Sequence, residues 1–155
     1  MKIIGAKRMQ TGCIYGVNYE GDIYADLIEF LKDYTNEEGY VSTCFLNETR
    51  LEEMRESNGL IVYKVADKIV GVCSFGGAEA FDMEGTCIGD LYVLKDYRNR
   101  DIGKTLVEKA EKEALNQMLN PPFVLDILDL HLQEFYEKLG YKPILDGYTM
   151  MKERI

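Results

Sequence analysis

A run of polar and basic residues at positions 98–104 has the composition of a phosphate-binding loop. Arg98, Arg100 and Lys104 supply positive charge, and Gly103 allows a backbone to come close to a ligand. The run follows an apolar stretch and precedes a helical pattern. It therefore sits at a helix N-terminus, where unpaired N–H groups and the helix dipole favour anions. An ordinary strand–helix connection with solvated basic side chains would have the same composition.

The spacing of the glycines excludes two nucleotide-binding motifs. A P-loop reads Gly-x-x-x-x-Gly-Lys-Ser/Thr, and Gly103-Lys104-Thr105 supplies only its end because Arg98 stands where the first glycine is needed. The dinucleotide fingerprint Gly-x-Gly-x-x-Gly does not occur in the sequence. Neither nucleotide-binding fold is therefore expected.

The elements that position this loop follow from hydrophobic periodicity and turn residues. Their order predicts an α/β fold with a mixed sheet, antiparallel at its start and with a strand–helix–strand crossover in its second half. The expected elements are helices at 22–34 and 49–56, a hairpin of 60–65 and 68–75, a strand at 87–94, a helix with the stripe Ile102, Leu106, Val107, Ala110, Ala114 and Met118, a strand at 123–128, a helix at 130–139 and a closing hairpin at 141–153. The second helix is expected to start with a Thr49-x-x-Glu52 capping box.

The segment Leu91-Tyr92-Val93, followed by Arg98-Asn99-Arg100-Asp101-Ile102-Gly103, resembles the acyl-CoA-binding motif of the GNAT N-acetyltransferase superfamily. That motif reads Leu-x-Val in a strand, then Gln/Arg-x-x-Gly-x-Gly/Ala at the start of the next helix. The resemblance implies one GNAT-like domain over residues 1–155, with a mixed central sheet flanked by helices and central strands that splay to bind CoA.

The same resemblance implies a set of residues that bind acetyl-CoA, the acetyl donor. Backbone groups of the strand would hold the pantetheine, and amides of the loop would hold the diphosphate. The residues are Leu91, Tyr92, Val93, Arg98, Asn99, Arg100, Asp101, Ile102, Gly103 and Lys104.

Asp101 departs from the motif because it replaces the first glycine. Aspartate tolerates a left-handed backbone better than most residues, so we expect the shape of the loop to survive. Its carboxylate would repel a diphosphate unless it points outward. We therefore expect weaker CoA binding than a glycine loop would give.

A second resemblance lies at Phe135-Tyr136-Glu137-Lys138-Leu139-Gly140-Tyr141, which is similar to the family segment Phe-Tyr-Glu-Lys-x-Gly-Phe. It implies that Tyr136 is the general acid that protonates the departing CoA thiolate. The Asn-x-x-Ala that often precedes this segment is altered to Asp129 and Leu132. Without the resemblance, spacing favours packing of Tyr136 at the edge of the core, since Leu132 and Leu139 lie on the same helical face.

An amine must lose a proton before it attacks a thioester, which calls for a general base. The stretch 79–90 holds four carboxylates and no basic residue. Glu84 and Asp90 are the candidate bases, whereas Glu79 and Asp82 fit a solvated acidic loop. The single histidine, His131, cannot form a His-Glu-x-x-His zinc site and is expected at the surface or in a cap.

Composition narrows the functional classes further. The formal net charge of −9 disfavours non-specific nucleic-acid binding, which needs clustered lysine and arginine. The apolar runs are too short for a membrane span. Four cysteines without a Cys-x-x-Cys pair, together with the lack of a secretory signal, indicate reduced thiols and a cytoplasmic location.

These observations predict an N-acetyltransferase that moves an acetyl group from acetyl-CoA directly to a primary amine of a small molecule or peptide. The acidic surface indicates a cationic acceptor, and a homodimer is possible. Two alternatives stay open. The first is a non-catalytic CoA-binding module that keeps the fold, which the off-pattern Asp101, Asp129 and Leu132 would fit. The second is a transferase that uses a longer acyl group.

Overall fold

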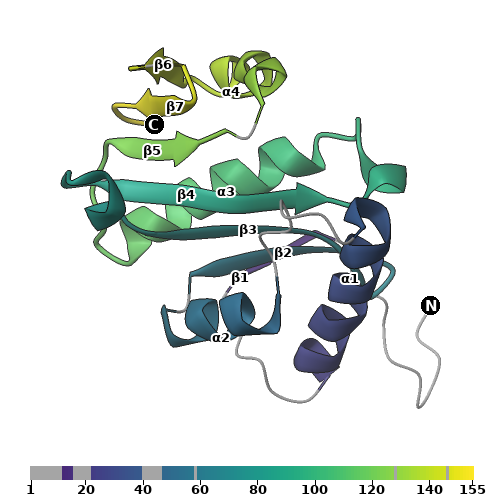
Figure 1. Cartoon of the computed structure of the whole chain (residues 1–155). Helices are drawn as coiled ribbons and strands as arrows, with labels where there is room; N and C mark the ends of the chain where they lie inside the picture. The colour runs from purple at the N-terminus through teal and green to yellow at the C-terminus, as the bar shows by residue number, and fades with distance from the viewer. Residues whose placement is uncertain (1–11, 16–21, 40–46, 58, 128, 146) are drawn as a thin grey trace, which may run out of the picture.

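The computed structural model describes residues 12–15, 22–39, 47–57, 59–127, 129–145 and 147–155 (Figure 1). These residues form one mixed seven-stranded sheet with helices on both faces, as the sequence predicted. In spatial order the strands are β1 (Gly12–Tyr15), β2 (Leu60–Val65), β3 (Lys68–Gly77), β4 (Thr86–Val93), β5 (Phe123–Asp126), β7 (Thr149–Lys152) and β6 (Lys142–Ile144). Neighbours are antiparallel except β4 and β5, which are parallel.

The helices join these strands in the predicted order. They are α1 (Asp22–Glu38), α2 (Glu48–Ser57), α3 (Ile102–Asn116) and α4 (Gln133–Lys138), with short 3-10 turns η1 (Glu79–Phe81), η2 (Lys95–Tyr97) and η3 (Leu130–Leu132). Helix α3 makes the crossover between the parallel strands β4 and β5. In the described part of the chain, no helix has the length and apolar character that a membrane crossing requires.

Consecutive residues of β4 show how the sheet is covered on both faces. Tyr92 packs edge-on against Tyr34 of α1, with ring centroids 4.6 Å apart. The next residue, Val93, approaches the backbone of Gly103 at the start of α3. Because adjacent side chains of a strand point to opposite faces, α1 and α3 cover the two sides of the sheet (Figure 1).

The first hairpin forms where the sequence predicted it. Ala66 and Asp67 link β2 to β3, and both have positive φ, at 50° and 68°. A two-residue turn of this kind matches the twist of the two strands that it joins. The prediction held because the two apolar runs and the short polar link between them are all local signals.

The elements of the first fifty residues differ from the prediction. Strand β1 was missed, because four residues paired only with β2 carry too little alternation to be recognised. Helix α1 continues to Glu38. Helix α2 begins at Glu48, and Asn47 Oδ1 accepts a hydrogen bond from the Arg50 N–H at 2.8 Å. The expected Thr49 capping box was therefore wrong, since Asn47 supplies the capping oxygen.

The end of α3 also corrects the prediction. Met118 continues the apolar spacing of the helix, but α3 ends at Asn116. Met118 lies beyond it with φ 65° and is 87% exposed. Sequence spacing alone could not reveal that the helix stops before this position. Asn58, which follows the helix expected at 49–56, and Asp146, which is within the hairpin expected at 141–153, lie outside the described residues.

Strands β4 and β5 pair only at their beginnings. Thr86 is opposite Phe123 and Cys87 is opposite Val124, and no further pairs follow although β4 continues to Val93. The two strands therefore separate towards their carboxyl ends, as the predicted splay requires. A parallel sheet that opens in this way exposes backbone groups of β4 to a ligand.

Candidate active site

A pocket of about 570 Å³ lies at the carboxyl ends of β4 and β5, where the two strands separate. Its walls come from α2, β3, β4, β5 and the segment that contains α4. The residues that line it are Arg50, Glu53, Ser74, Phe75, Gly76, Gly77, Phe81, Cys87, Ile88, Gly89, Asp90, Leu91, Leu125, Asp126, Ile127, Leu132 and Tyr136.

Strand β4 carries a β-bulge beside this pocket. Asp90 and Leu91 together face the single residue Cys73 of β3, because the register shifts between Val72 and Ser74. Asp90 has a left-handed backbone, with φ 48°. A bulge takes backbone groups out of the ladder and bends the strand. This part of β4 can therefore offer N–H and C=O groups to a ligand.

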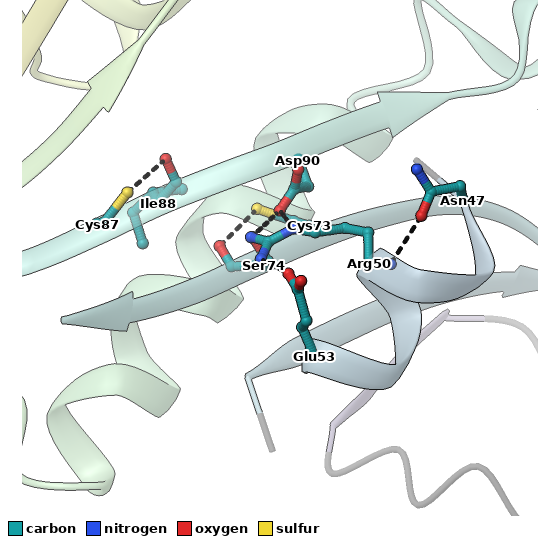
Figure 2. A network of polar contacts seen from close by, with 8 residues as sticks. All are labelled: Asn47, Arg50, Glu53, Cys73, Ser74, Cys87, Ile88 and Asp90. Carbon is teal, nitrogen blue, oxygen red and sulfur yellow. Dashed lines mark hydrogen bonds and ion pairs between the residues drawn. The ribbon is translucent and has the colours of Figure 1, made fainter. Parts of the chain in front are cut away.

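The Asp90 carboxylate is held by side chains from two other elements (Figure 2). Its Oδ2 accepts hydrogen bonds from Arg50 Nε at 3.0 Å, from Arg50 Nη2 at 2.6 Å and from Ser74 Oγ at 2.7 Å. Arg50 Nη1 also donates to Glu53 Oε2 at 3.1 Å. The carboxylate side chain is 12% exposed, so these bonds replace most of its hydration.

Tyr136 lines the pocket from α4 and is 8% exposed. Its ring packs edge-on against Phe135 and Tyr141, with centroids at 4.9 and 5.9 Å. Among the described residues its hydroxyl has no hydrogen-bond partner. Burial raises the pKa of Tyr136 above the ordinary tyrosine value, so the phenol stays protonated at neutral pH. A buried protonated phenol at a pocket is suited to act as an acid.

A second buried hydrogen-bond network includes Tyr141, whose ring packs against Tyr136. The Tyr141 hydroxyl donates to Glu111 Oε2 at 2.8 Å, and Lys152 Nζ donates to both Glu111 oxygens at 3.1 and 3.2 Å. The Glu111 residue is 1% exposed. These bonds tie α3 to β7 and fix Tyr141, against which the Tyr136 ring packs.

In the predicted diphosphate loop, the two arginines bond to the protein backbone. Arg98 Nε donates to the Val93 carbonyl at 2.8 Å, and its guanidinium lies 5.1 Å from the Tyr92 ring centroid. Arg100 Nη2 donates to the Asp96 carbonyl at 3.0 Å. These contacts shape the loop, and both residues remain exposed at the start of α3.

Asp101 has a left-handed backbone, with φ 60° and ψ 15°. Glycine adopts this conformation most readily, and aspartate tolerates it better than most residues. The effect of the replacement on CoA binding stays a prediction. The Asp101 carbonyl accepts from the Thr105 N–H and hydroxyl at 3.0 and 2.8 Å, while its carboxylate makes no capping bond. Gly103 faces Phe135, and a Cβ at Gly103 would lie 3.2 Å from the Phe135 Cζ. The two sequence motifs therefore meet in the fold.

The structure brings together only some of the predicted site residues. Tyr136, Asp90 and Leu91 line the pocket, whereas the exposed Glu84 lies in the bend before β4 and is not part of the lining. Tyr92 points its side chain away, and its hydroxyl donates to Glu37 Oε1 at 3.0 Å. Any contact of Tyr92 with a ligand in the splay must therefore use its backbone.

Four polar residues of the pocket were missed by the sequence reasoning. Arg50 and Glu53 come from α2, Ser74 from β3 and Asp126 from the end of β5. Asp126 is the last residue of an otherwise buried strand, and a polar residue at that position is a weak signal. The other three have no motif that would distinguish them from ordinary polar residues of a helix or a strand.

Three of the four cysteines and the single histidine lie within the described residues. Cys13, Cys73 and Cys87 are free thiols, while Cys44 lies outside those residues. Cys87 lines the pocket, and burial, followed by the charge of Asp90, raises its pKa to about 11. His131 is exposed, which is one of the two expected placements, and it is not the capping residue: its backbone N–H donates at 3.1 Å to Oδ1 of Asp129, which caps η3.

Comparison with known proteins agrees with this geometry. The family model for the acetyltransferase (GNAT) domain matches residues 56–143. An uncharacterized N-acetyltransferase of Chlorobaculum tepidum is 28% identical over 116 residues, which cover 74% of this chain and 70% of that protein.

Solved structures share the fold at low sequence identity. A GNAT family acetyltransferase from Brucella melitensis in complex with acetyl-CoA has a TM-score of 0.66 and 12% identity, with 94% of this chain and 89% of that chain covered. The PaiA N-acetyltransferase from Thermoplasma acidophilum in complex with coenzyme A has a TM-score of 0.61 and 18% identity, with 94% and 99% covered.

The family match thus places the chain, an α/β protein, among the acyl-CoA-dependent acetyltransferases. The chain belongs to the GNAT acetyltransferase family, because the family model covers more than half of it. Acetyl-CoA is the cosubstrate, as the sequence resemblance implied.

Proposed function

We propose that this protein transfers the acetyl group of acetyl-CoA directly to a primary amine of a small molecule or peptide, within a ternary complex. The observation that carries the proposal is the Tyr136 hydroxyl. It is buried, it has no hydrogen-bond partner among the described residues, and it lines a pocket beside the β4 bulge.

In this proposal β4 binds the donor through its backbone. Leu91, Tyr92 and Val93 hold the pantetheine, and backbone N–H groups at the bulge polarise the thioester carbonyl as an oxyanion site does. The loop from Arg98 to Lys104, through Asn99, Arg100, Asp101, Ile102 and Gly103, binds the diphosphate. Its position at the N-terminus of α3 supports this role, because helix N-termini attract phosphate.

The transfer needs one proton acceptor and one proton donor. The ammonium group first loses one proton to the base, and the neutral nitrogen then attacks the carbonyl carbon. The C–N bond forms, the C–S bond breaks, and the nitrogen releases its second proton to solvent to leave a neutral amide. Tyr136 donates its phenolic proton to the departing thiolate and regains one from solvent. Holding both reactants in one pocket supplies the proximity on which such a direct transfer depends.

Asp90 is the proposed base, acting through Oδ1. Its other oxygen, Oδ2, already accepts three hydrogen bonds from Arg50 and Ser74. Glu84 has no support from the pocket lining and remains a prediction. A pH–rate profile of Glu84→Gln and Asp90→Asn tests both residues, because only the variant that removes the base should lower the rate on the neutral plateau and abolish the acidic limb.

Two measurements test the function. Acetyl-CoA and CoA, but not ATP, should raise the thermal midpoint, because a ligand that binds only the folded state stabilises it. Thiol release from acetyl-CoA with primary amines should then be lost in Tyr136→Phe. Binding of CoA without turnover on any amine would instead indicate a non-catalytic CoA-binding module, and a faster rate with longer acyl-CoAs would revise the donor.

A further inference from the structure

The residues that line the pocket carry more negative than positive charge. Its lining includes one cation, Arg50, and three carboxylates, Glu53, Asp90 and Asp126, which sum to a formal charge of −2. Glu53 comes from α2 and Asp126 from the carboxyl end of β5, so acidic groups lie on both sides of the bulge. A site of this charge attracts cations and repels anions.

The single cation of the lining is already bound. Arg50 gives Nε and Nη2 to Asp90 and Nη1 to Glu53. A free carboxylate next to the reacting amine would therefore meet Glu53 and Asp126 without an available arginine to pair with. A free guanidinium is the side chain that pairs best with a carboxylate, because it donates two parallel hydrogen bonds.

The Tyr136 hydroxyl points independently to a ligand in the same pocket. It is a polar group of a side chain that is 8% exposed, and within the described residues it lacks a partner. Buried hydroxyls normally find one, so a bound molecule is the natural source. The thioester end of the donor accounts for one part of the pocket, and the carboxylate-lined remainder is left for the acceptor.

We infer that the acceptor carries a second positive charge besides the reacting amine and no carboxylate near it, as in a diamine or an unblocked basic side chain. The inference rests on the proposed function. Glu53 and Asp126 would bind the distal ammonium group, while the proximal nitrogen, once neutral, faces the thioester.

Three five-carbon amines test the inference, because they differ only at the far end. Cadaverine ends in an ammonium, pentylamine in a methyl and aminovaleric acid in a carboxylate. Partly exposed ion pairs contribute up to about 1 kcal/mol, so kcat/KM should fall about fivefold from cadaverine to pentylamine and again to aminovaleric acid. The preference should shrink at high salt, since screening weakens charge pairing but not apolar contacts.

Variants of the two acidic groups supply a second readout. Asp126→Asn and Glu53→Gln should each lower the ratio of kcat/KM for cadaverine over pentylamine. Glu53→Gln should also raise the relative rate with aminovaleric acid, because the charge opposing its carboxylate is removed. Glu134→Gln, on the exposed surface of α4, is the matched control and should leave the ratios unchanged.

The outcomes separate this inference from the proposed function. Equal kcat/KM for all three amines, or a preference for aminovaleric acid, would overturn the inference and leave amine acetylation standing. Binding of acetyl-CoA with no acetylation of any amine would overturn the proposed function itself. A cadaverine preference that survives both acidic substitutions would show that Glu53 and Asp126 are not the groups that recognise the distal charge.

Discussion

Arg50 of α2 donates two hydrogen bonds to one carboxylate oxygen of Asp90 in β4, at 3.0 and 2.6 Å (Figure 2). The two residues are forty positions apart in sequence, and the ion pair joins a helix to the bulge of the strand that borders the pocket. The ion pair holds the side chain of Asp90, whose backbone is left-handed, and it lines the α2 side of the candidate acceptor site.

This pairing predicts a measurable coupling in stability. Arg50→Ala should lower the free energy of unfolding by about 1–2 kcal/mol, because it leaves a mostly buried carboxylate without its charged partner. Arg50 is partly exposed, so solvent screening keeps this cost below that of a fully buried pair. In an Asp90→Asn background the same change should cost less than about 0.5 kcal/mol. Urea unfolding of the four proteins measures the cycle, and additive effects would show that the pair is not coupled.

Tyr136 and Tyr141 predict opposite consequences for the same substitution. Tyr136→Phe should reduce kcat by about 10²-fold or more with little loss of stability, because no hydrogen bond of its hydroxyl to a described residue is broken. Tyr141→Phe should cost roughly 1–2 kcal/mol of stability, since Glu111 loses a buried donor. Thermal unfolding and steady-state kinetics separate the two.

The pH dependence of kcat follows from the raised pKa of Tyr136. A higher pKa keeps the phenol protonated to higher pH, so the acid form should persist above the ordinary tyrosine value. Deprotonation of Tyr136 should therefore cause no loss of kcat at any pH below 10. A fall centred near pH 8 that disappears in Tyr136→Phe would contradict this reading.

Asp101 should limit the affinity for CoA through its charge. Asp101→Gly and Asp101→Asn both remove the carboxylate from the start of α3, where about 0.3–1 kcal/mol of interaction with a phosphate is at stake. Both should tighten CoA binding roughly two- to fivefold by calorimetry. Asp67→Gly is the matched control and should leave CoA binding unchanged, since Asp67 is also an aspartate with positive φ, at 68°, but lies in the turn between β2 and β3. Unchanged or weaker binding in both Asp101 variants would contradict the role.

Cys87 should report on occupation of the pocket. Its pKa of about 11 leaves little thiolate at pH 8, so alkylation by iodoacetamide should be slow and should rise about tenfold per pH unit up to that value. Acetyl-CoA should slow it further if the donor fills the pocket. Peptide mass spectrometry distinguishes Cys87 from the other thiols, and equal labelling with and without acetyl-CoA would place the donor elsewhere.

Gly85 should be intolerant of a side chain. It has φ 141°, and a Cβ would lie 2.5 Å from the Pro122 carbonyl oxygen, which accepts the Thr86 N–H that begins the β4–β5 pairing. Gly85→Ala should lower stability by about 2 kcal/mol or more. Gly76→Ala, where a Cβ meets nothing within 4 Å, is the control and should change it little.

Local sequence patterns were enough to predict most of the helices and strands. The β2–β3 hairpin, the strand before the basic loop and the crossover helix α3 follow from periodicity and turn residues that lie next to each other in sequence. The short edge strand β1 and the end of α3 before Met118 did not, because their limits depend on pairing and packing with distant segments.

The sequence by itself determined the family, the donor and the candidate acid, because the motifs around Arg98–Gly103 and Tyr136 are contiguous. Only the tertiary structure decided the acceptor side. Arg50, Glu53, Ser74 and Asp126 come from α2, β3 and β5, and no spacing in the chain marks them as neighbours. Their charges act together because folding carries them to one pocket, and a pairing through space between distant segments leaves no periodic trace in the sequence.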